Sequence, residues 1–250
     1  HGDLGSMTGE GRSDNGDKTL MNALKTTLFA AAATFAMTGA AFAQDSEVFD
    51  FSFNVGAATD YVFRGISQTD ENYQVFAGVD TTLWGVGYAG AWISNVDFGD
   101  STKGEFDLYA GVKPQVGPVS LDLGVLYYGY MNAPSGSNLD YVEWKIAGSV
   151  PVGPATVGAA VYWSDDFAGT GNATYVELNG SVPVAEKVSI SGAVGRQDVD
   201  YNGDYSTWNL GVSYALNDIV GFDLRYHDTD KHKFGDLYDS RVVLSLKASF

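Results

Sequence analysis

The dominant feature of the chain is an alternation of apolar and polar residues with a period of two. In the segment 105–113 (EFDLYAGVK), apolar residues occupy every second position from Phe106 to Val112. The segments 49–55, 220–227 and 241–250 repeat this pattern. Because successive side chains of a strand point to opposite faces, the pattern predicts β-strands with one apolar and one polar face. We find no helical period after residue 43.

The alternating runs predict twelve strands separated by turn residues. They are 48–64, 72–82, 86–95, 103–113, 119–130, 139–150, 155–164, 173–183, 188–198, 206–215, 219–228 and 239–250. The connections between them alternate strictly between long and short. The long ones are 65–71, 96–102, 131–138, 165–172, 199–205 and 229–238, and the tight ones are 83–85, 114–118, 151–154, 184–187 and 216–218.

An even strand number with alternating long loops and tight turns is typical of a transmembrane, antiparallel, up-and-down β-barrel. The alternative is a soluble β-sandwich or a lipocalin-like barrel. Twelve strands enclose more volume than a dry core would fill, and the polar faces carry charges in mid-strand, which suits a wet interior. Aromatic residues also gather near strand ends, as membrane-interface girdles require. They are Tyr127, Tyr128, Tyr130, Tyr162, Trp163, Trp208 and Tyr226.

The N-terminal part of the chain differs from the rest in composition and pattern. Residues 1–20 are polar and Gly-rich, and we interpret them as an upstream segment that does not belong to the fold. From Met21 the chain shows a charged start with Lys25, an apolar stretch and the small-residue ending Ala41-Phe42-Ala43. This is the pattern of a cleavable signal peptide over 21–43. The barrel would then occupy 44–250 and lie in a bacterial outer membrane.

Charge and cysteine content narrow the function classes. The segment after residue 43 carries 27 acidic and 11 basic side chains, so a nucleic-acid partner is not expected. The chain has no cysteine, which excludes thiolate metal sites and thiol chemistry. No metal and no cofactor are predicted.

Four segments resemble one known family. Residues 59–70 (TDYVFRGISQTD) are similar to the N-terminal signature of the proteobacterial Gcw_chp family, also called the TorF family of porins. Residues 90–98 (GAWISNVDF), 105–111 (EFDLYAG) and 122–128 (DLGVLYY) continue the resemblance. The resemblance implies an outer-membrane barrel with a porin role, but it does not name a solute.

The candidate site is a set of charges that alternation places on the inner face of the barrel. Asp60 and Arg64 share the parity of the polar positions of the first strand. The other members are Glu105, Asp107, Asp223 and Arg225, with Asp97 in a connecting loop. Fixed charges in a narrow pore set its selectivity, and the acidic excess favours cations. The competing interpretation is a network of ion pairs that braces the wall.

Two further motifs were weighed. Residues 198–204 (DVDYNGD) match the first half of a calcium loop, but their twelfth position is Asn209, so a hairpin turn is the simpler interpretation. After residue 43 the only histidines are His227 and His232. A hydrolase on the barrel wall would need one of them beside a serine, and no hydrolase motif is present, so an enzyme is not predicted.

The sequence therefore predicts a narrow, mildly cation-preferring channel for passive passage of small solutes or ions. The alternatives are a closed barrel that serves structurally or presents its loops, and a lipid hydrolase. The expected partners are small solutes, membrane lipid and lipopolysaccharide. The barrel assembly machinery would bind the last strand, which ends at Phe250. Whether several copies assemble stays open.

Overall fold

The computed structural model describes residues 49–200 and 203–250, which form one closed antiparallel barrel. The predicted signal peptide and upstream segment lie outside the described residues. The twelve wall strands are β1 (Phe49–Ala58), β4 (Gln74–Leu83), β5 (Gly87–Asn95), β6 (Gly104–Val112), β8 (Val119–Met131), β9 (Tyr141–Val152), β10 (Ala155–Ser164), β11 (Ala173–Ala185), β12 (Val188–Val199), β13 (Tyr205–Ala215), β14 (Val220–Thr229) and β15 (Arg241–Ser249).

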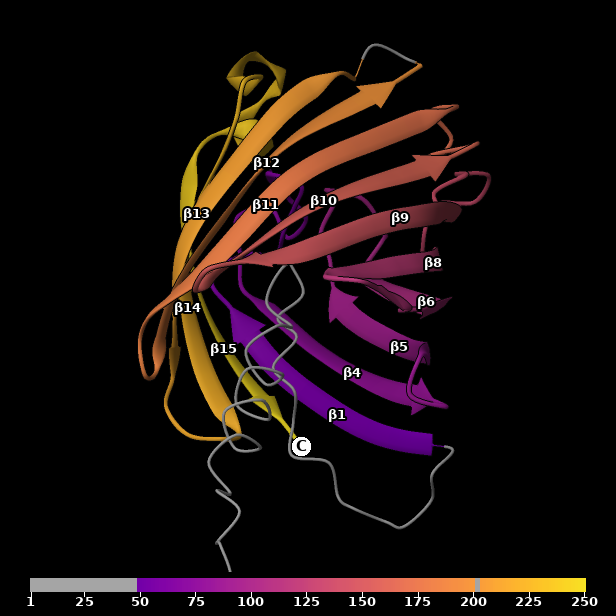
Figure 1. The fold of residues 1–250 in the computed structure, drawn as a ribbon. Helices are drawn as coiled ribbons and strands as arrows, with labels where there is room; N and C mark the ends of the chain where they lie inside the picture. The colour runs from indigo at the N-terminus through magenta and orange to yellow at the C-terminus, as the bar shows by residue number, and fades with distance from the viewer. Residues whose placement is uncertain (1–48, 201–202) are drawn as a thin grey trace, which may run out of the picture.

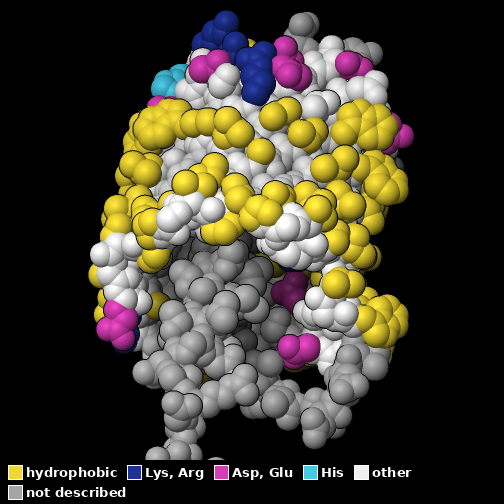
Figure 2. Space-filling model, in the orientation of Figure 1, with side chains coloured by type: hydrophobic (Ala, Val, Ile, Leu, Met, Phe, Trp, Pro, Cys, Tyr) yellow, Lys and Arg dark blue, Asp and Glu magenta, His cyan; other side chains and the backbone are white. Residues whose placement is uncertain are grey.

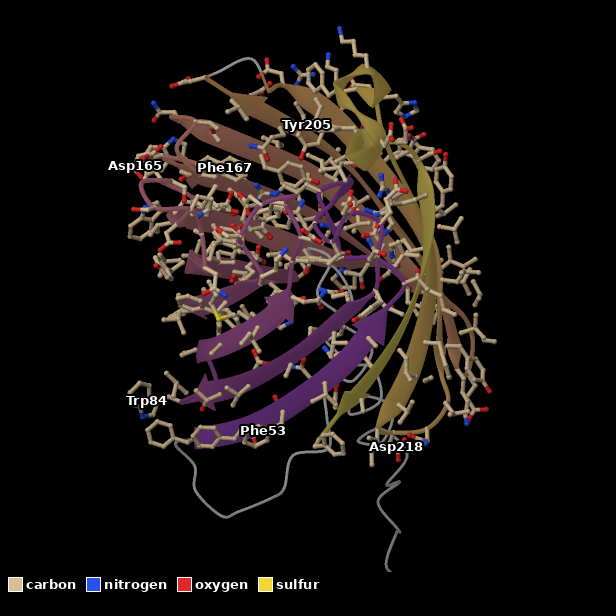
Figure 3. The ribbon with its side chains drawn as sticks, turned by 180° about the vertical axis from the view of Figure 1, so that it is seen from behind. Phe53, Trp84, Asp165, Phe167, Tyr205 and Asp218 are labelled. Carbon is tan, nitrogen blue, oxygen red and sulfur yellow. The ribbon has the colours of Figure 1, made fainter. Side chains whose placement is uncertain are left out.

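Each wall strand pairs with the next wall strand along the chain, and the pairing of β1 with β15 closes the ring. The short strand β7 (Gln115–Val116) lies between β6 and β8 in the chain, and β6 pairs directly with β8. Long and tight connections alternate along the chain. Trp84 and Asp218, on two tight turns, lie at the lower end, as does the C-terminus, whereas Asp165 and Tyr205 lie near the upper end (Figures 1 and 3). The predicted twelve-stranded barrel is thereby confirmed.

The two faces of the wall differ in polarity as the alternation requires. On β1, Phe49, Phe51 and Phe53 are each about half exposed, and the residues between them face the interior. Apolar side chains cover much of the outside, and charged side chains gather at the upper rim (Figure 2). No helix among the described residues is long and apolar enough to cross a membrane.

The aromatic residues named from the sequence divide between the two faces. Trp163 and Trp208 are exposed on the outer wall, in agreement with an aromatic girdle. Tyr128 and Tyr162 are about 95% buried inside the barrel, and Tyr130 contacts Glu105 there, so their assignment to a girdle was wrong. On β10, Tyr162 has the parity opposite to that of Trp163, and on β8, Tyr128 and Tyr130 share the parity of the polar Asp122, so the alternation already places them inside.

The first strand is shorter than predicted. The alternation suggested a strand over 48–64, but β1 ends at Ala58. The chain then turns into the interior, which we call the lumen. Residues 59–73 form the luminal hairpin, whose two short strands are β2 (Val62–Phe63) and β3 (Ile66–Ser67). The alternation continues through residue 64 because β2 is itself a strand, although it is not part of the wall.

The loop between β14 and β15 contains two short 3-10 helices, η1 (His232–Phe234) and η2 (Asp236–Tyr238). His232 Nε2 lies 2.7 Å from Asp228 Oδ1, and this hydrogen bond raises the pKa of His232 above its ordinary value of 6.5. We expect Asp228→Asn to lower that pKa towards 6.5, as measured by NMR titration of the imidazole ring. The contact should hold below the ordinary pKa and weaken as pH rises through the raised one.

A matched control for this titration is Asp236→Asn, in the same loop. The Asp236 side chain makes no contact with the imidazole, so its replacement should leave the pKa of His232 in place. An equal effect of both substitutions would contradict the assigned role of Asp228.

Candidate functional site

The tip of the luminal hairpin is a tight turn in which both central residues have positive φ values. Arg64 and Gly65 have φ values of 48° and 86°, as a two-residue hairpin turn requires at both central positions. A Cβ atom on Gly65 would collide with the side chains of Thr207 and Thr229 on β13 and β14. The turn therefore reaches the opposite wall so closely that only glycine fits.

The tip of the hairpin is fixed by the guanidinium group of Arg64. Its Nη1 and Nη2 atoms each donate to Glu143 on β9 at 2.8 Å, and Nη1 also donates to Gln197 Oε1 on β12 at 3.0 Å. The guanidinium lies over the rings of Tyr162 and Tyr175, at 4.9 and 4.3 Å from their centroids. Both charged side chains are almost fully buried, so the pair is a two-bond, desolvated ion pair.

The base of the hairpin is fixed by Asp60. Its Oδ2 accepts a 2.9 Å hydrogen bond from Arg241 on β15. Its Oδ1 accepts from the hydroxyls of Ser67 and Thr69, which belong to the returning half of the hairpin. A third anchor is Tyr61, whose hydroxyl donates to Glu105 on β6 at 2.7 Å. The hairpin is therefore bonded to β6, β9, β12 and β15, which lie around the circumference, and it crosses the lumen.

Glu105 and Asp107 lie two residues apart on β6 and face the lumen. Glu105 is 2% exposed, and its side-chain partners among the described residues are tyrosine hydroxyls alone. Asp107 Oδ1 is buried and has no hydrogen-bond partner among the described residues. No Lys or Arg of the described residues lies within ion-pair distance of either carboxylate. This part of the wall therefore holds two carboxyl groups that no neighbouring cation balances.

Tyrosines satisfy most of the luminal carboxylates. Five tyrosine hydroxyls donate to carboxylate oxygens at distances between 2.6 and 3.1 Å. The pairs are Tyr61–Glu105, Tyr88–Asp122, Tyr109–Asp80, Tyr128–Glu143 and Tyr175–Glu177. Because a tyrosine donor is neutral, it stabilises a carboxylate without cancelling its charge. The lumen can therefore be ordered and still negative.

The remaining predicted residues lie elsewhere. Asp223 and Arg225 face the lumen from β14 and pair with each other at 3.0 Å. Arg225 also donates to Asn209 and Ser191, so this cluster braces the wall between neighbouring strands. Asp97 lies in the loop between β5 and β6, is exposed and pairs with Lys103 at 3.2 Å. The structure thus brings Asp60, Arg64, Glu105 and Asp107 to the hairpin and leaves the other three outside that group.

Sequence reasoning missed the partners of Arg64. Glu143 and Gln197 were not singled out, and Tyr162 was assigned to the aromatic girdle. Their parity on β9, β10 and β12 was the only available signal, and it gives a facing but no contact.

The motif 198–204 forms a hairpin connection. Asp198 and Asp204 both pair with Arg196, and residues 201 and 202 lie outside the described part. Among residues 49–200 and 203–250, no group of three or more His, Asp or Glu side chains could hold a metal ion.

These features define a closed antiparallel β-barrel whose lumen is crossed by one of its own loops. The chain belongs to the Gcw_chp family, described as a bacterial protein of unknown function, whose profile matches residues 42–250. The resemblance noted at residues 59–70 is thereby confirmed. No curated protein matches the sequence.

Solved porin structures share the fold. The KdgM porin aligns with a TM-score of 0.58 at 8% identity, covering 80% of this chain and 99% of that one. A second KdgM structure, in complex with disordered oligogalacturonate, gives the same values. The NanC porin aligns with a TM-score of 0.53 at 10% identity, covering 80% and 97%. At these identities the likeness establishes the barrel and its strand arrangement.

Proposed function

We propose that the protein is an outer-membrane channel for passive passage of small solutes or ions, narrowed by the luminal hairpin and mildly cation-preferring. The single observation that carries this proposal is the hairpin, which is bonded to four sides of a polar lumen. A loop that folds into the lumen reduces the free cross-section of the passage.

The location follows from the two faces of the wall. Every backbone group in a bilayer must find a hydrogen-bond partner, and a closed barrel meets that requirement. The outward side chains of β1, β9 and β15 are large and apolar, which fits contact with acyl chains. The inward side chains are polar, which fits water.

The cation preference follows from the luminal charges. Glu177 has no cationic partner among the described residues, whereas Arg64, Arg241 and Arg225 are each paired with a carboxylate. Fixed charges in a narrow, poorly hydrated passage act on each passing ion. The passage should therefore attract cations more strongly than anions.

The test is single-channel recording in a planar bilayer under a salt gradient, together with Glu177→Gln. The wild type should give conductance steps with a cation-selective reversal potential. Glu177→Gln should shift that potential towards zero, because it removes a luminal carboxylate whose side-chain partners, Tyr175 and Asn179, are neutral. The matched control is Asp97→Asn, which removes one charge from an exposed loop and should leave the reversal potential nearly unchanged.

The same hairpin also favours a second candidate, a closed barrel that presents its loops. A folded barrel that gives no conductance steps, alone or with the hairpin displaced, would overturn the channel and support this alternative. Catalysis is not part of either proposal. His227 is buried on the inner wall, away from the lipid that a membrane hydrolase would attack.

A further inference from the structure

Four side chains of the wall surround the guanidinium group of Arg64. They are Glu143 on β9, Tyr162 on β10, Tyr175 on β11 and Gln197 on β12. We call these four residues the cation cage. They come from four consecutive strands, and Tyr175 is opposite both Tyr162 and Gln197 in the strand register. None of them belongs to the luminal hairpin, so the wall supplies all four.

The cage has the geometry of a guanidinium receptor. Glu143 presents both carboxylate oxygens to two nitrogens at 2.8 Å, which is the fork-to-fork arrangement that a planar guanidinium favours. The carbonyl oxygen of Gln197 accepts a third hydrogen bond at 3.0 Å. The two tyrosine rings cover the cation, as aromatic rings do in sites for organic cations. An inorganic cation would use neither the fork nor the rings in this way.

One donor in the cage is left over. Gln197 is 1% exposed, and its Nε2 atom has no hydrogen-bond partner among the described residues. Burying an amide donor without an acceptor costs free energy. Arg64 offers no acceptor to this group, because a guanidinium carries only donors. A ligand with an acceptor oxygen near its guanidinium group would satisfy the cage more fully than Arg64 does.

We propose that the cation cage is a binding site for guanidinium-bearing organic cations that enter the lumen, and that Arg64 occupies it as a tethered internal ligand. The role in passage rests on the proposed channel function, but the binding itself does not.

Two features set how well a free ligand competes with Arg64. Tethering gives Arg64 a high effective concentration at the cage, so a free ligand binds the wild type weakly. Arg64 also has a φ of 48°, a backbone region that is unfavourable for residues other than glycine, and this strain weakens its hold. A ligand that displaces Arg64 releases the tip of the luminal hairpin and widens the lumen. The cage is therefore also the point at which a solute would act on the constriction.

The test vacates the cage and offers methylguanidinium chloride at millimolar concentration to the full chain, folded in detergent micelles. We expect the thermal unfolding midpoint of Arg64→Ala, followed by circular dichroism, to rise with methylguanidinium in a saturable way. The midpoint of the wild type should not rise, because its cage is filled. The double variant Arg64→Ala/Glu143→Gln should not respond either, because the fork is lost. Ligand binding to the folded state alone raises stability in this manner.

The matched control is Arg196→Ala. It also removes an arginine that pairs with carboxylates, Asp198 and Asp204, but that cluster is about half exposed and the cage stays filled, so methylguanidinium should not affect it. Potassium chloride at the same concentration controls for ionic strength. The proposal is overturned if Arg64→Ala shows no response, or if Arg64→Ala/Glu143→Gln responds equally.

A second variant keeps the test decisive if Arg64→Ala fails to fold. Arg64→Lys retains the luminal charge, but its ammonium group cannot form the fork. Methylguanidinium should therefore bind this variant at lower concentrations than the wild type, and equal responses would contradict the proposal. Binding is measured here without any current. A barrel that binds methylguanidinium but never conducts refutes the channel alone, and one that conducts but does not bind refutes the cage alone.

Discussion

Replacing Glu143 by Ala is expected to destabilise the folded barrel by about 3–5 kcal/mol, because the substitution leaves a buried guanidinium without its counter-ion. The side chains of Arg64 and Glu143 are only 6% and 2% exposed, so water cannot replace the lost carboxylate. The substitution also removes the acceptor of the Tyr128 hydroxyl. Reversible urea unfolding in lipid vesicles, followed by tryptophan fluorescence, would measure the change in the free energy of unfolding.

The control for this prediction is Asp97→Ala, which also removes one carboxylate from an ion pair. Asp97 and its partner Lys103 are both about half exposed, and exposed pairs contribute little because water screens them. The urea midpoint of Asp97→Ala should therefore stay close to that of the wild type. Adding Arg64→Ala to Glu143→Ala should recover part of the lost stability, because the unpaired cation is then gone. Without such recovery, the loss would not come from the ion pair.

The wall of the barrel could be predicted because its information is local. The period of two fixes which side chains point inward, and it placed Glu105, Asp107 and Asp223 on the inner face without any knowledge of their neighbours. The turn residues between the runs fixed the number of strands. The alternation alone could also have prevented the wrong assignment of Tyr128 and Tyr162 to the aromatic girdle, since both have the parity of inward positions.

The luminal hairpin could not be predicted because its information is not local. In the sequence, Glu143 lies 79 positions from its partner Arg64, and Gln197 lies 133 positions from it. Arg241 lies 181 positions from its partner Asp60. A short run such as 61–64 alternates in the same way whether it belongs to the wall or to a hairpin inside it. The single local signal is Gly65, which marks a turn directly after residue 64 but does not show which way the chain turns. Closure of the barrel decides where that turn points.

Gly65→Ala is expected to raise the single-channel conductance several-fold by preventing the luminal hairpin from docking. The added Cβ would meet the side chains of Thr207 and Thr229, and Gly65 has a φ of 86° that alanine adopts poorly. The two threonines cannot easily turn away. Their hydroxyls donate to the backbone carbonyls of Asp228 and Tyr238 at 2.8 and 2.7 Å, and β-branched side chains are stiff at χ1. Planar-bilayer recording would compare the step sizes.

The control that separates backbone strain from lost docking is Gly136→Ala. Gly136 has nearly the same φ, 84°, but a Cβ there would meet no atom within 4 Å. This substitution strains an external loop without touching the lumen, so its conductance steps should match those of the wild type. Because Gly65→Ala changes no charge, its larger steps should keep the cation preference that Glu177 helps to set. Steps of wild-type size would mean that the luminal hairpin does not limit the flow of ions. The constriction would then have to lie in the wall itself, at residues that the hairpin does not contact.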